Sequence, residues 1–377
     1  MNFEKLDEFL AHQEERGIPA CDMTVTVDGR VVYRSLWGFS DLEKTKPTST
    51  KDMYYLYSLS KVATCVGALR ALERGLIALD DPVSKYLPAF AHLKVRQRDG
   101  SVTDAQNVMT IKHLFTMSGG LNYDMHTPAL ERARAEGRTD TISFVSAIAE
   151  TPLFFEPGTS YEYSLCHDVL AAVVEVASGI RFADYQQKEI FDPLGMTDTT
   201  YHMNEEQKSR LSTLYGYDEA TYEAHLRSSQ NNDFIVSPAY DSGGAGLSST
   251  ADSYLPLIAT VSRGGTALNG YELLRPETVQ MMQKNYLSPE ATRKFAAGRF
   301  GGYGWGLCCR THLRPDISFS PSSVGECGWD SAGNAYALMD PAKKIGILYV
   351  THVCGCNTGY FLFHPKLRAL TYEALES

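Results

Sequence analysis

Two pairs of β-rich segments, one near each end of the chain, constrain the fold most strongly. The first pair spans residues 23–37 around Asp28-Gly29, and the second spans residues 335–351 around a turn at 340–343. Residues of high β propensity on both sides of an Asp-Gly dipeptide are typical of an antiparallel hairpin. Strands at both ends of one chain indicate a single antiparallel sheet to which both termini contribute.

The long middle of the chain is rich in helical patterns and predicts a second structural unit. We expect an α/β (α+β) fold in which residues 1–75 and 241–377 form an antiparallel sheet flanked by helices. Residues 76–240 would form an inserted, mainly helical lobe. Helices are also predicted near both ends, from 3 to 15 and from 365 to 375. A cleft between two such parts is a common place for a small-molecule site.

The composition argues against several kinds of partner. The chain has 377 residues, of which 44% are hydrophobic, so a large core can form without a metal or a disulfide. The formal net charge of −10 argues against nucleic acid or an anionic membrane as the main partner. The sequence contains no apolar run of about 18 residues, so no membrane span is predicted. The first residues lack the pattern of a secretory signal. We therefore expect a cytoplasmic protein, whose oligomeric state does not follow from the sequence.

The eight cysteines are scattered and predict buried, reduced thiols. None of them forms a Cys-x-x-Cys pair with zinc spacing. The one local cluster, His352-Val353-Cys354-Gly355-Cys356, has no further ligands nearby in the sequence. We expect no metal and no cofactor. The cysteines are Cys21, Cys65, Cys166, Cys308, Cys309, Cys327, Cys354 and Cys356.

The segment Ser58-Leu59-Ser60-Lys61 is the first candidate for chemistry. The residues after it have a helical pattern that ends at Gly75. Ser58 and Lys61 would then lie on one face of the helix, so the amine can reach the hydroxyl. A serine nucleophile needs a basic partner, and a desolvated lysine with a lowered pKa can contribute one. A plain helix cap is the alternative interpretation of this serine.

Tyr163 is the second candidate. It follows a turn at 157–158 and precedes an apolar helical pattern, 169–176, that ends at Gly179. A tyrosine in a loop ahead of a buried helix is well placed to carry a proton, provided that a nearby cation such as Lys61 stabilises the phenolate. Because the chain has 22 tyrosines, ordinary packing is the alternative.

Residues 325–334, just ahead of the second terminal hairpin, are the third candidate. The segment contains Trp329, Ser331 and Ala332 among several small residues. Small residues let a backbone N–H approach a substrate carbonyl closely. A tight entry into a strand explains the same residues equally well.

In this order, the three segments resemble the motifs of the serine β-lactamase and penicillin-binding-protein superfamily, especially its class C-like branch of family VIII esterases. The resemblance runs nearly from end to end. Further matching segments are Leu79-Asp80-Asp81-Pro82-Val83, Tyr86-Leu87-Pro88, Leu114-Phe115-Thr116-Met117-Ser118-Gly119-Gly120-Leu121, Pro193-Leu194-Gly195-Met196, Gly243-Gly244-Ala245-Gly246-Leu247-Ser248-Ser249-Thr250 and Met339-Asp340-Pro341.

The resemblance implies a serine hydrolase that acts on a small ester or amide. It implies an acyl-enzyme on Ser58, with Lys61 and Tyr163 sharing the roles of general base and acid. It also implies an oxyanion site made of the backbone N–H of Ser58 and one near Ala332.

Two positions depart from the usual pattern of the superfamily. Its common Tyr-x-Asn is here Tyr163-Ser164-Leu165, which lacks the amide. Its Lys-Thr-Gly or His-x-Gly motif aligns with Trp329-Asp330-Ser331, and Glu326-Cys327-Gly328 is a second register. The apolar Leu165 and the indole of Trp329 favour a substrate less polar than a β-lactam.

Other functions stay open at this point. An acyltransferase would use the same acyl-enzyme, a D-amino-acid peptidase or β-lactamase would use the same scaffold, and a non-catalytic binding protein could keep the cleft without the chemistry. Asp168 fits a structural role in the first turn of a helix, and the role of His167 is open. Tyr123, Tyr303 and Trp305 are candidate lining residues.

Overall fold

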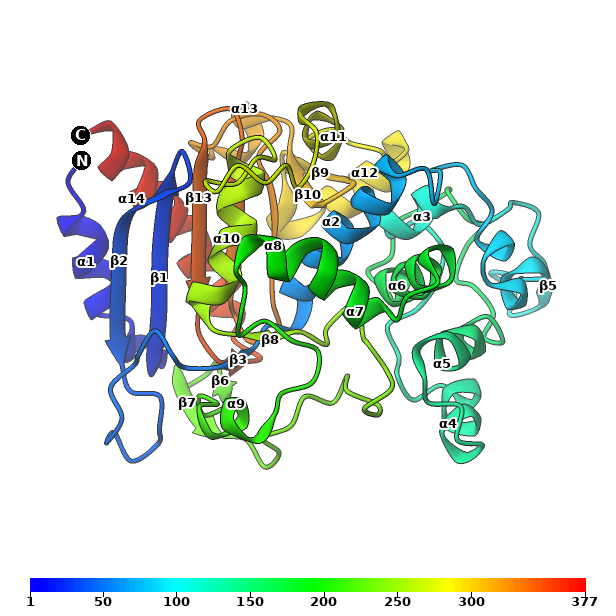
Figure 1. Ribbon diagram of the computed structural model, residues 1–377, viewed down its shortest axis with the longest axis horizontal. Helices are drawn as coiled ribbons and strands as arrows, with labels where there is room; N and C mark the ends of the chain where they lie inside the picture. Colours follow the sequence, from blue (N-terminus) through cyan, green and yellow to red (C-terminus); the bar gives the residue numbers. More distant parts are fainter.

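The computed structural model describes residues 1–377 and contains a seven-stranded antiparallel sheet built from both ends of the chain (Figure 1). The two predicted hairpins lie side by side in it, because β1 pairs with β13 in a register that places Val25 opposite Ile347. In spatial order the strands are β2 (Arg30–Gly38), β1 (Ala20–Val27), β13 (Ile345–Val350), β12 (Tyr336–Asp340), β11 (Cys327–Asp330), β10 (Cys309–His312) and β9 (Tyr303–Gly306).

Helices cover both faces of the sheet. Alternate residues of a strand point to opposite faces, and on β13 Ile347 belongs to one hydrophobic cluster while Leu348 belongs to the main core. The terminal helices α1 (Glu4–Ala11) and α14 (His364–Glu376) pack on the Ile347 face, and α10 (Ala251–Ser262) packs on the Leu348 face. The predicted antiparallel sheet flanked by helices is therefore confirmed.

The first helix is shorter than predicted. It ends at Ala11, and the chain continues in the 3-10 helix η1 (Glu14–Arg16) before Gly17, whose φ is 75°. Gln13 lies between the two helices, and its buried side chain donates to Cys21 Sγ at 2.7 Å and accepts from the Tyr349 hydroxyl at 3.0 Å. These contacts hold the chain against the sheet at Gln13, whereas a continuous helix would lead it away from the sheet.

The middle of the chain is mainly helical, and α2 (Ser60–Glu73) and α6 (Cys166–Ser178) form its centre. Both helices are almost wholly buried and belong to the main core, which also includes residues of the sheet. The other α-helices are α3 (Ile111–Phe115), α4 (Pro128–Ala135), α5 (Thr141–Ile148), α7 (Phe182–Gln186), α8 (Asp192–Leu194), α9 (Glu205–Ser209), α11 (Pro276–Met282), α12 (Pro289–Ala296) and α13 (Pro315–Ser318).

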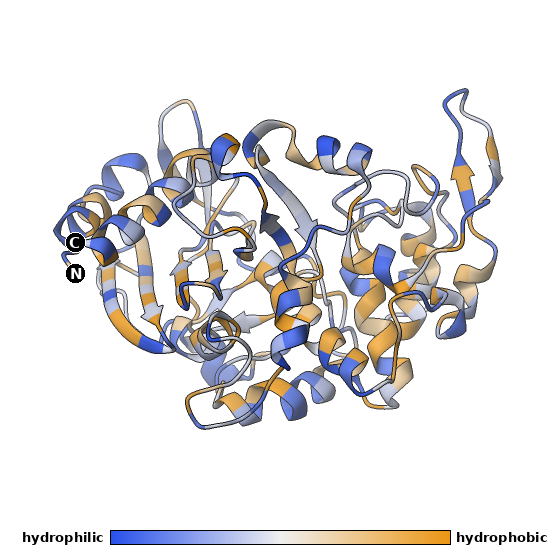
Figure 2. Ribbon diagram, turned by 90° about the horizontal axis from the view of Figure 1, so that it is seen from above, coloured by the Kyte–Doolittle hydropathy of each residue, from blue (hydrophilic) through white to orange (hydrophobic).

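Short strands and helical turns complete the fold. Figure 2 shows hydrophobic residues as orange bands on helices and strands that also carry hydrophilic positions. No helix combines the length and the apolar composition that a membrane crossing needs. The small sheets are β3 (Tyr54–Tyr55) with β8 (Ser248–Ser249), β4 (Lys94–Arg96) with β5 (Val102–Asp104), and β14 (Val353–Cys354) with β6 (Tyr215–Asp218) and β7 (Glu223–Leu226). The remaining turns are η2 (Tyr57–Leu59), η3 (Val83–Lys85), η4 (Pro88–Ala91), η5 (Gln187–Phe191), η6 (Gly298–Phe300) and η7 (Gly359–Phe363).

Candidate active site

Ser58 lies in the short 3-10 helix η2 that leads from β3 into α2. Tyr57, the residue before it, has a φ of 44°, a left-handed conformation that is strained for a tyrosine. Neighbouring bonds fix this turn: Leu56 N–H donates to Leu247 O, and Leu247 N–H donates to Ser60 Oγ, both at 2.9 Å. The strained turn holds the Ser58 hydroxyl in the wall of a cavity.

Lys61 lies one helical turn after Ser58, on the same face of the chain, and its side chain is fully buried. Its Nζ donates to Ser58 Oγ at 3.2 Å, to the Tyr123 hydroxyl at 2.9 Å and to Gly244 O at 2.7 Å. An ammonium group has three N–H donors. All three of its donors are therefore satisfied, and the amine is held beside the serine.

Tyr163 contacts Ser58 from the loop ahead of α6, and a position in such a loop is what the sequence predicts. Its hydroxyl donates to Ser58 Oγ at 2.7 Å and accepts from Trp329 Nε1 at 3.0 Å. Its ring stacks on Tyr123, with the centroids 5.1 Å apart. The structure thus brings Ser58, Lys61, Tyr163 and Trp329, which lie far apart in the sequence, into one cluster.

A lysine with a lowered pKa is expected beside the serine from the sequence, but the pKa of Lys61 is raised. Burial lowers the pKa of Lys61, but the hydroxyls of Tyr123 and Tyr163 favour the ammonium more strongly and raise that pKa above its ordinary value. Burial raises the pKa of Tyr163, and the nearby Lys61 only partly offsets this effect. At neutral pH the pair therefore consists of an ammonium and a neutral phenol, both donating to Ser58.

Asp168 supports the cluster from α6 without contacting Ser58. Its Oδ1 accepts from Ser242 Oγ at 2.6 Å, from the Tyr240 hydroxyl at 2.9 Å and from Gly244 N–H at 3.3 Å. Gly244 in turn supplies the carbonyl that binds Lys61. A Cβ at Gly244 would lie 2.3 Å from Asp168 Oδ2, so only glycine permits this approach.

His167 takes no part in the cluster around Ser58. Burial lowers its pKa to about 3, so the ring is neutral, and its Nε2 lies 3.1 Å from Phe115 O. Together with Cys65 and Cys309 it forms a buried set of three potential metal ligands whose atoms lie within 4.8 Å of one another. This set is one ligand short of a closed zinc site.

The ligand atoms of His352, Cys354 and Cys356, which lie close together in the sequence, are not all within 4.8 Å of one another. Both ring nitrogens of His352 are engaged by the backbone, one with Ser212 O at 2.9 Å and the other with Tyr55 N–H at 3.3 Å. Nothing in this geometry suggests that the three side chains bind a metal together.

The third predicted segment forms the end of β11 and the turn that follows it. We call residues 331–334 the oxyanion turn, after the role proposed for it below. Ala332 lines the cavity, and its N–H donates to no group of the chain. The turn is held by a bond from Ser331 N–H to Ala335 O at 2.9 Å and one from the Tyr360 hydroxyl to Ser331 O at 2.8 Å.

Of the two registers considered for this motif, Trp329-Asp330-Ser331 is the one at the cavity. The alternative places Glu326, Cys327 and Gly328 there. Instead, the Glu326 carboxylate is buried against Arg310 at 2.7 Å, and Cys327 and Gly328 lie in the interior of β11.

The cavity around Ser58 has a volume of about 460 Å³ and a largely aromatic wall. The charged residues of the wall are Arg299 and Asp330, and the Arg299 guanidinium donates to both carboxylate oxygens of Asp330 at 2.5 and 3.1 Å. Ser331 and Ala332 line the cavity as predicted. Nine aromatic side chains contribute: Tyr57, Tyr123, Tyr161, Tyr163, Phe234, Phe295, Phe300, Trp329 and Tyr360.

Three of the expected lining residues lie elsewhere. Leu165 is 1% exposed and packs in the main core, because its backbone begins α6 and its side chain turns inward. Tyr303 and Trp305 are also core residues, and Trp305 Nε1 donates to Phe115 O at 2.8 Å. Tyr123, by contrast, lines the cavity and contacts Lys61.

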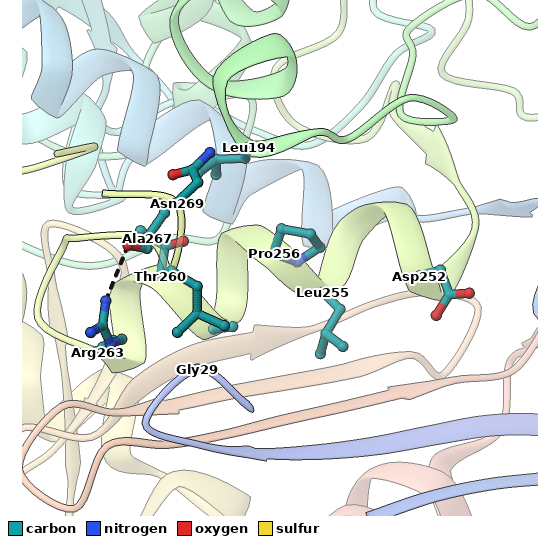
Figure 3. Close-up of a pocket in the computed structure, with 11 residues that line it drawn as sticks. Gly29, Leu194, Asp252, Leu255, Pro256, Thr260, Arg263, Ala267 and Asn269 are labelled. Atoms are coloured by element: carbon teal, nitrogen blue, oxygen red, sulfur yellow. Dashed lines mark hydrogen bonds between the residues drawn. The ribbon is translucent and has the colours of Figure 1, made fainter. Parts of the chain in front are cut away.

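Another pocket lies along α10, away from the serine (Figure 3). It has a volume of about 280 Å³ and is bounded by Gly29 of the first hairpin, by Leu255 and Pro256 of α10, and by Leu268. It contains no nucleophile with an adjacent base, so we assign the chemistry to the cavity around Ser58.

Comparisons with known proteins point to one family. The sequence profile of the beta-lactamase family matches residues 5–355. Protein Rv1367c of Mycobacterium tuberculosis (strain ATCC 25618 / H37Rv) is 26% identical over 330 residues, which cover 84% of this chain and 81% of that protein. Esterase EstB of Burkholderia gladioli is 28% identical over 374 residues, which cover 92% of this chain and 88% of the esterase.

Solved structures share the whole fold. EstCE1, described as a hydrolase with promiscuous acyltransferase activity, superimposes with a TM-score of 0.81 at 24% identity, and the match covers 98% of each chain. The predicted fold class is therefore confirmed over the full length of the chain.

Proposed function

This chain belongs to the beta-lactamase family and is a serine hydrolase or acyltransferase, and we propose that it hydrolyses a small ester or amide through an acyl-enzyme on Ser58. The observation that carries the proposal is the position of Ser58 Oγ, which lies between Tyr163 at 2.7 Å and Lys61 at 3.2 Å. A nucleophile within hydrogen-bond reach of a group that can take its proton is the required arrangement for covalent catalysis.

In the proposed first step, Ser58 Oγ attacks the carbonyl carbon of the substrate. Its proton passes to the phenolate form of Tyr163, which the Lys61 ammonium stabilises across the cluster. The carbonyl oxygen becomes an oxyanion and accepts from two backbone N–H groups, those of Ser58 and Ala332. The Ser58 N–H lies at the start of a helical segment, where such groups have no intrahelical partner.

In the second step the tetrahedral intermediate collapses. Tyr163 gives its proton to the oxygen or nitrogen of the leaving group, and the carbon–leaving group bond breaks. Water then attacks the acyl-enzyme while Tyr163 takes a proton from it, and Ser58 regains its proton as the acid is released. An alcohol or amine in place of water would make the same chain an acyltransferase.

The aromatic wall of the cavity supports an ester with a leaving group of low polarity over a β-lactam. The residue that would align with the lysine of the usual Lys-Thr-Gly motif is Trp329, and its indole donates to Tyr163. Apart from Lys61, the cation at the cavity is Arg299, which is paired with Asp330. We expect nitrocefin turnover to be far slower than ester turnover, and comparable rates would contradict this choice.

Covalent labelling tests the proposal against a non-catalytic binding protein on the same scaffold. The protein is incubated with a fluorophosphonate, and the modified residue is located by peptide mass spectrometry. We expect a single adduct on Ser58 in the wild type and none in Ser58→Ala. An unlabelled wild type would support the binding protein instead.

A further inference from the structure

A second compartment opens off the catalytic cavity, on the side of the oxyanion turn. It has a volume of about 780 Å³. Four residues line both spaces, namely Tyr57, Phe234, Ala332 and Tyr360. The two spaces therefore meet beside Ala332, where the carbonyl oxygen of a bound substrate is proposed to lie. A substrate bound at Ser58 would therefore lie next to this compartment.

Two arginines line the combined space, and they differ in how well they are paired. Arg299 makes two hydrogen bonds to Asp330. Arg227, in the second compartment, has only a long ion pair of 3.6 Å to Asp233 and a contact of 3.5 Å to Cys354 Sγ. The Asp233 side chain is 67% exposed, so it can turn to solvent. Arg227 is therefore the cation that is available to bind a substrate anion.

The position of the proton carrier decides which part of the substrate reaches Arg227. Tyr163 must lie next to the leaving group in order to protonate it. Ser58 and Tyr163 line the catalytic cavity but not the second compartment. The leaving group thus stays in the aromatic cavity, and the acyl chain is the part that can extend past Ala332 toward Arg227.

We propose that Arg227 binds a carboxylate at the far end of the acyl chain, so that the preferred substrates are esters of dicarboxylic acids with one free carboxylate. A guanidinium presents paired N–H donors in a planar fork that matches a carboxylate. The inference rests on the proposed function, because it names the substrate class of the same acyl-enzyme. Arg227 acts here on specificity and takes no part in the bond chemistry.

The test compares two substrates that differ in the charge of the distal carboxyl group and by one methyl group. They are the mono-p-nitrophenyl ester of adipic acid and the methyl ester of that compound, which is neutral. Each is assayed with wild type, Arg227→Gln, which removes the charge, and Arg227→Lys, which retains it. A third substrate, 4-carboxyphenyl butyrate, places the carboxylate on the leaving group instead.

We expect Arg227→Gln to lower kcat/KM for the charged adipate ester about tenfold, mainly through KM, which corresponds to about 1.4 kcal/mol. The neutral ester should change less than about twofold, since its chain has no anion to bind. Arg227→Lys should recover part of the loss.

An equal effect of Arg227→Gln on both adipate esters, or no effect on either, would overturn the inference while leaving the proposed function intact. A selective loss on 4-carboxyphenyl butyrate would overturn the assignment of the acyl chain to this compartment. A wild type that hydrolyses none of these three esters would contradict the proposed function itself, and this inference with it.

Discussion

The Ser58 hydroxyl oxygen accepts hydrogen bonds from Lys61 and Tyr163, and both donors hold their protons at neutral pH. Burial raises the pKa of Tyr163, and the two neighbouring tyrosine hydroxyls raise that of Lys61 against the opposing effect of its burial. One proton must leave the pair before it can act as a base. The two groups interact so closely that they titrate as a unit.

The first prediction concerns the pH dependence of ester hydrolysis. The reactive form is the deprotonated pair, and both pKa values lie above their ordinary ranges. We therefore expect kcat/KM to rise by up to about tenfold per pH unit from about pH 7 to about pH 9, with no decline on the basic side before about pH 10. A bell-shaped profile with a maximum near neutrality would show that the base has a lowered pKa.

Removal of the Tyr163 hydroxyl gives the second prediction. Tyr163→Phe keeps the ring that stacks on Tyr123 but loses the proton carrier, so we expect kcat to fall by about 10²- to 10⁴-fold. Tyr161→Phe is the matched control, because it removes a hydroxyl from the same cavity that makes no bond to Ser58. Steady-state rates with p-nitrophenyl butyrate measure both variants, and equal losses would indicate a general effect of the cavity wall.

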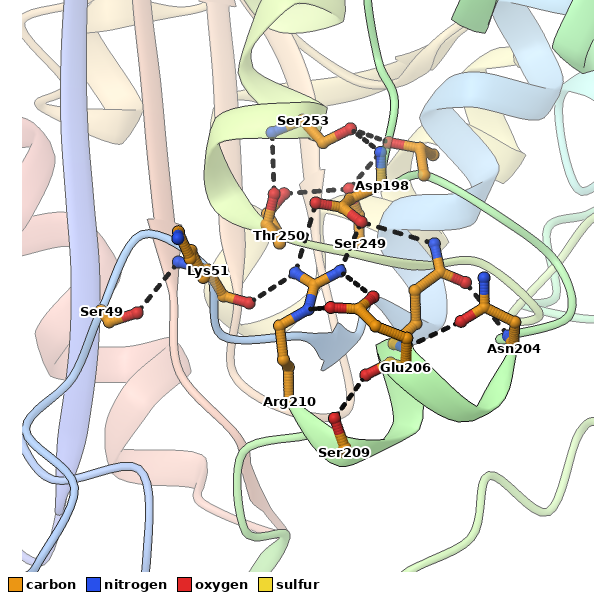
Figure 4. Close-up of polar contacts among 12 residues, drawn as sticks. Ser49, Lys51, Asp198, Asn204, Glu206, Ser209, Arg210, Ser249, Thr250 and Ser253 are labelled. Atoms are coloured by element: carbon orange, nitrogen blue, oxygen red, sulfur yellow. Dashed lines mark hydrogen bonds and ion pairs between the residues drawn. The ribbon is translucent and has the colours of Figure 1, made fainter.

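At the scale of elements, hydrogen bonds from Arg210 hold the segment that precedes β3 and leads to Ser58 (Figure 4). The Arg210 side chain donates to Lys51 O at 2.8 Å and to Asp198 at 2.6 Å, and its own carbonyl accepts from Met53 N–H at 2.9 Å. These bonds join the segment after α9 to the residues just before β3. They hold the chain that precedes the strained turn at Tyr57.

We expect Arg210→Ala to lower the free energy of unfolding by about 1–3 kcal/mol, since it leaves the Asp198 carboxylate and the Lys51 carbonyl without their partner. Arg132→Ala is the control, because the ion pair of Arg132 with Glu150 is exposed and should contribute less than about 1 kcal/mol. Urea denaturation of the two variants provides the comparison. Equal losses would mean that the Arg210 bonds add no more than an ordinary surface pair.

Elements with a strong local pattern could be predicted from the sequence. The Asp28-Gly29 hairpin and the end of α6 at Gly179 follow from turn and cap preferences. Ser58 and Lys61 could be paired because one helical turn separates them. The bond between Gly244 and Lys61, the support from Asp168, and the burial of Leu165 depend on segments far apart in the chain. No local sequence pattern predicts such contacts.

On the scale of the whole molecule, one hydrophobic core joins the sheet to the helices. Leu170 of α6 and Leu348 of β13 are both fully buried in this core, although one lies in the predicted helical lobe and the other in the predicted sheet domain. The division into 1–75 with 241–377 and 76–240 stays a prediction. β6, from the inserted range, pairs with β14 near the C-terminus on one side and with β7 on the other.

The shared core predicts a single cooperative unfolding transition. Leu170→Ala and Leu348→Ala should each cost about 2–5 kcal/mol, and each should shift the whole transition to lower urea concentration. Circular dichroism follows the helices, and tryptophan fluorescence follows Trp37 in β2 together with Trp305 and Trp329 near the cavity. Transitions that separate in one variant but not in the other would show that the two parts unfold independently.

The most direct test of the central claim is the release of p-nitrophenol from p-nitrophenyl butyrate by wild type and by Ser58→Ala, measured from about pH 6 to about pH 10. An acyl-enzyme on Ser58 predicts that the wild type turns over the ester and that Ser58→Ala loses activity by about 10³-fold or more, because no other side chain of the cluster can replace the nucleophile. Equal rates for the two proteins, whether both slow or both absent, would contradict the assignment of Ser58 as the nucleophile.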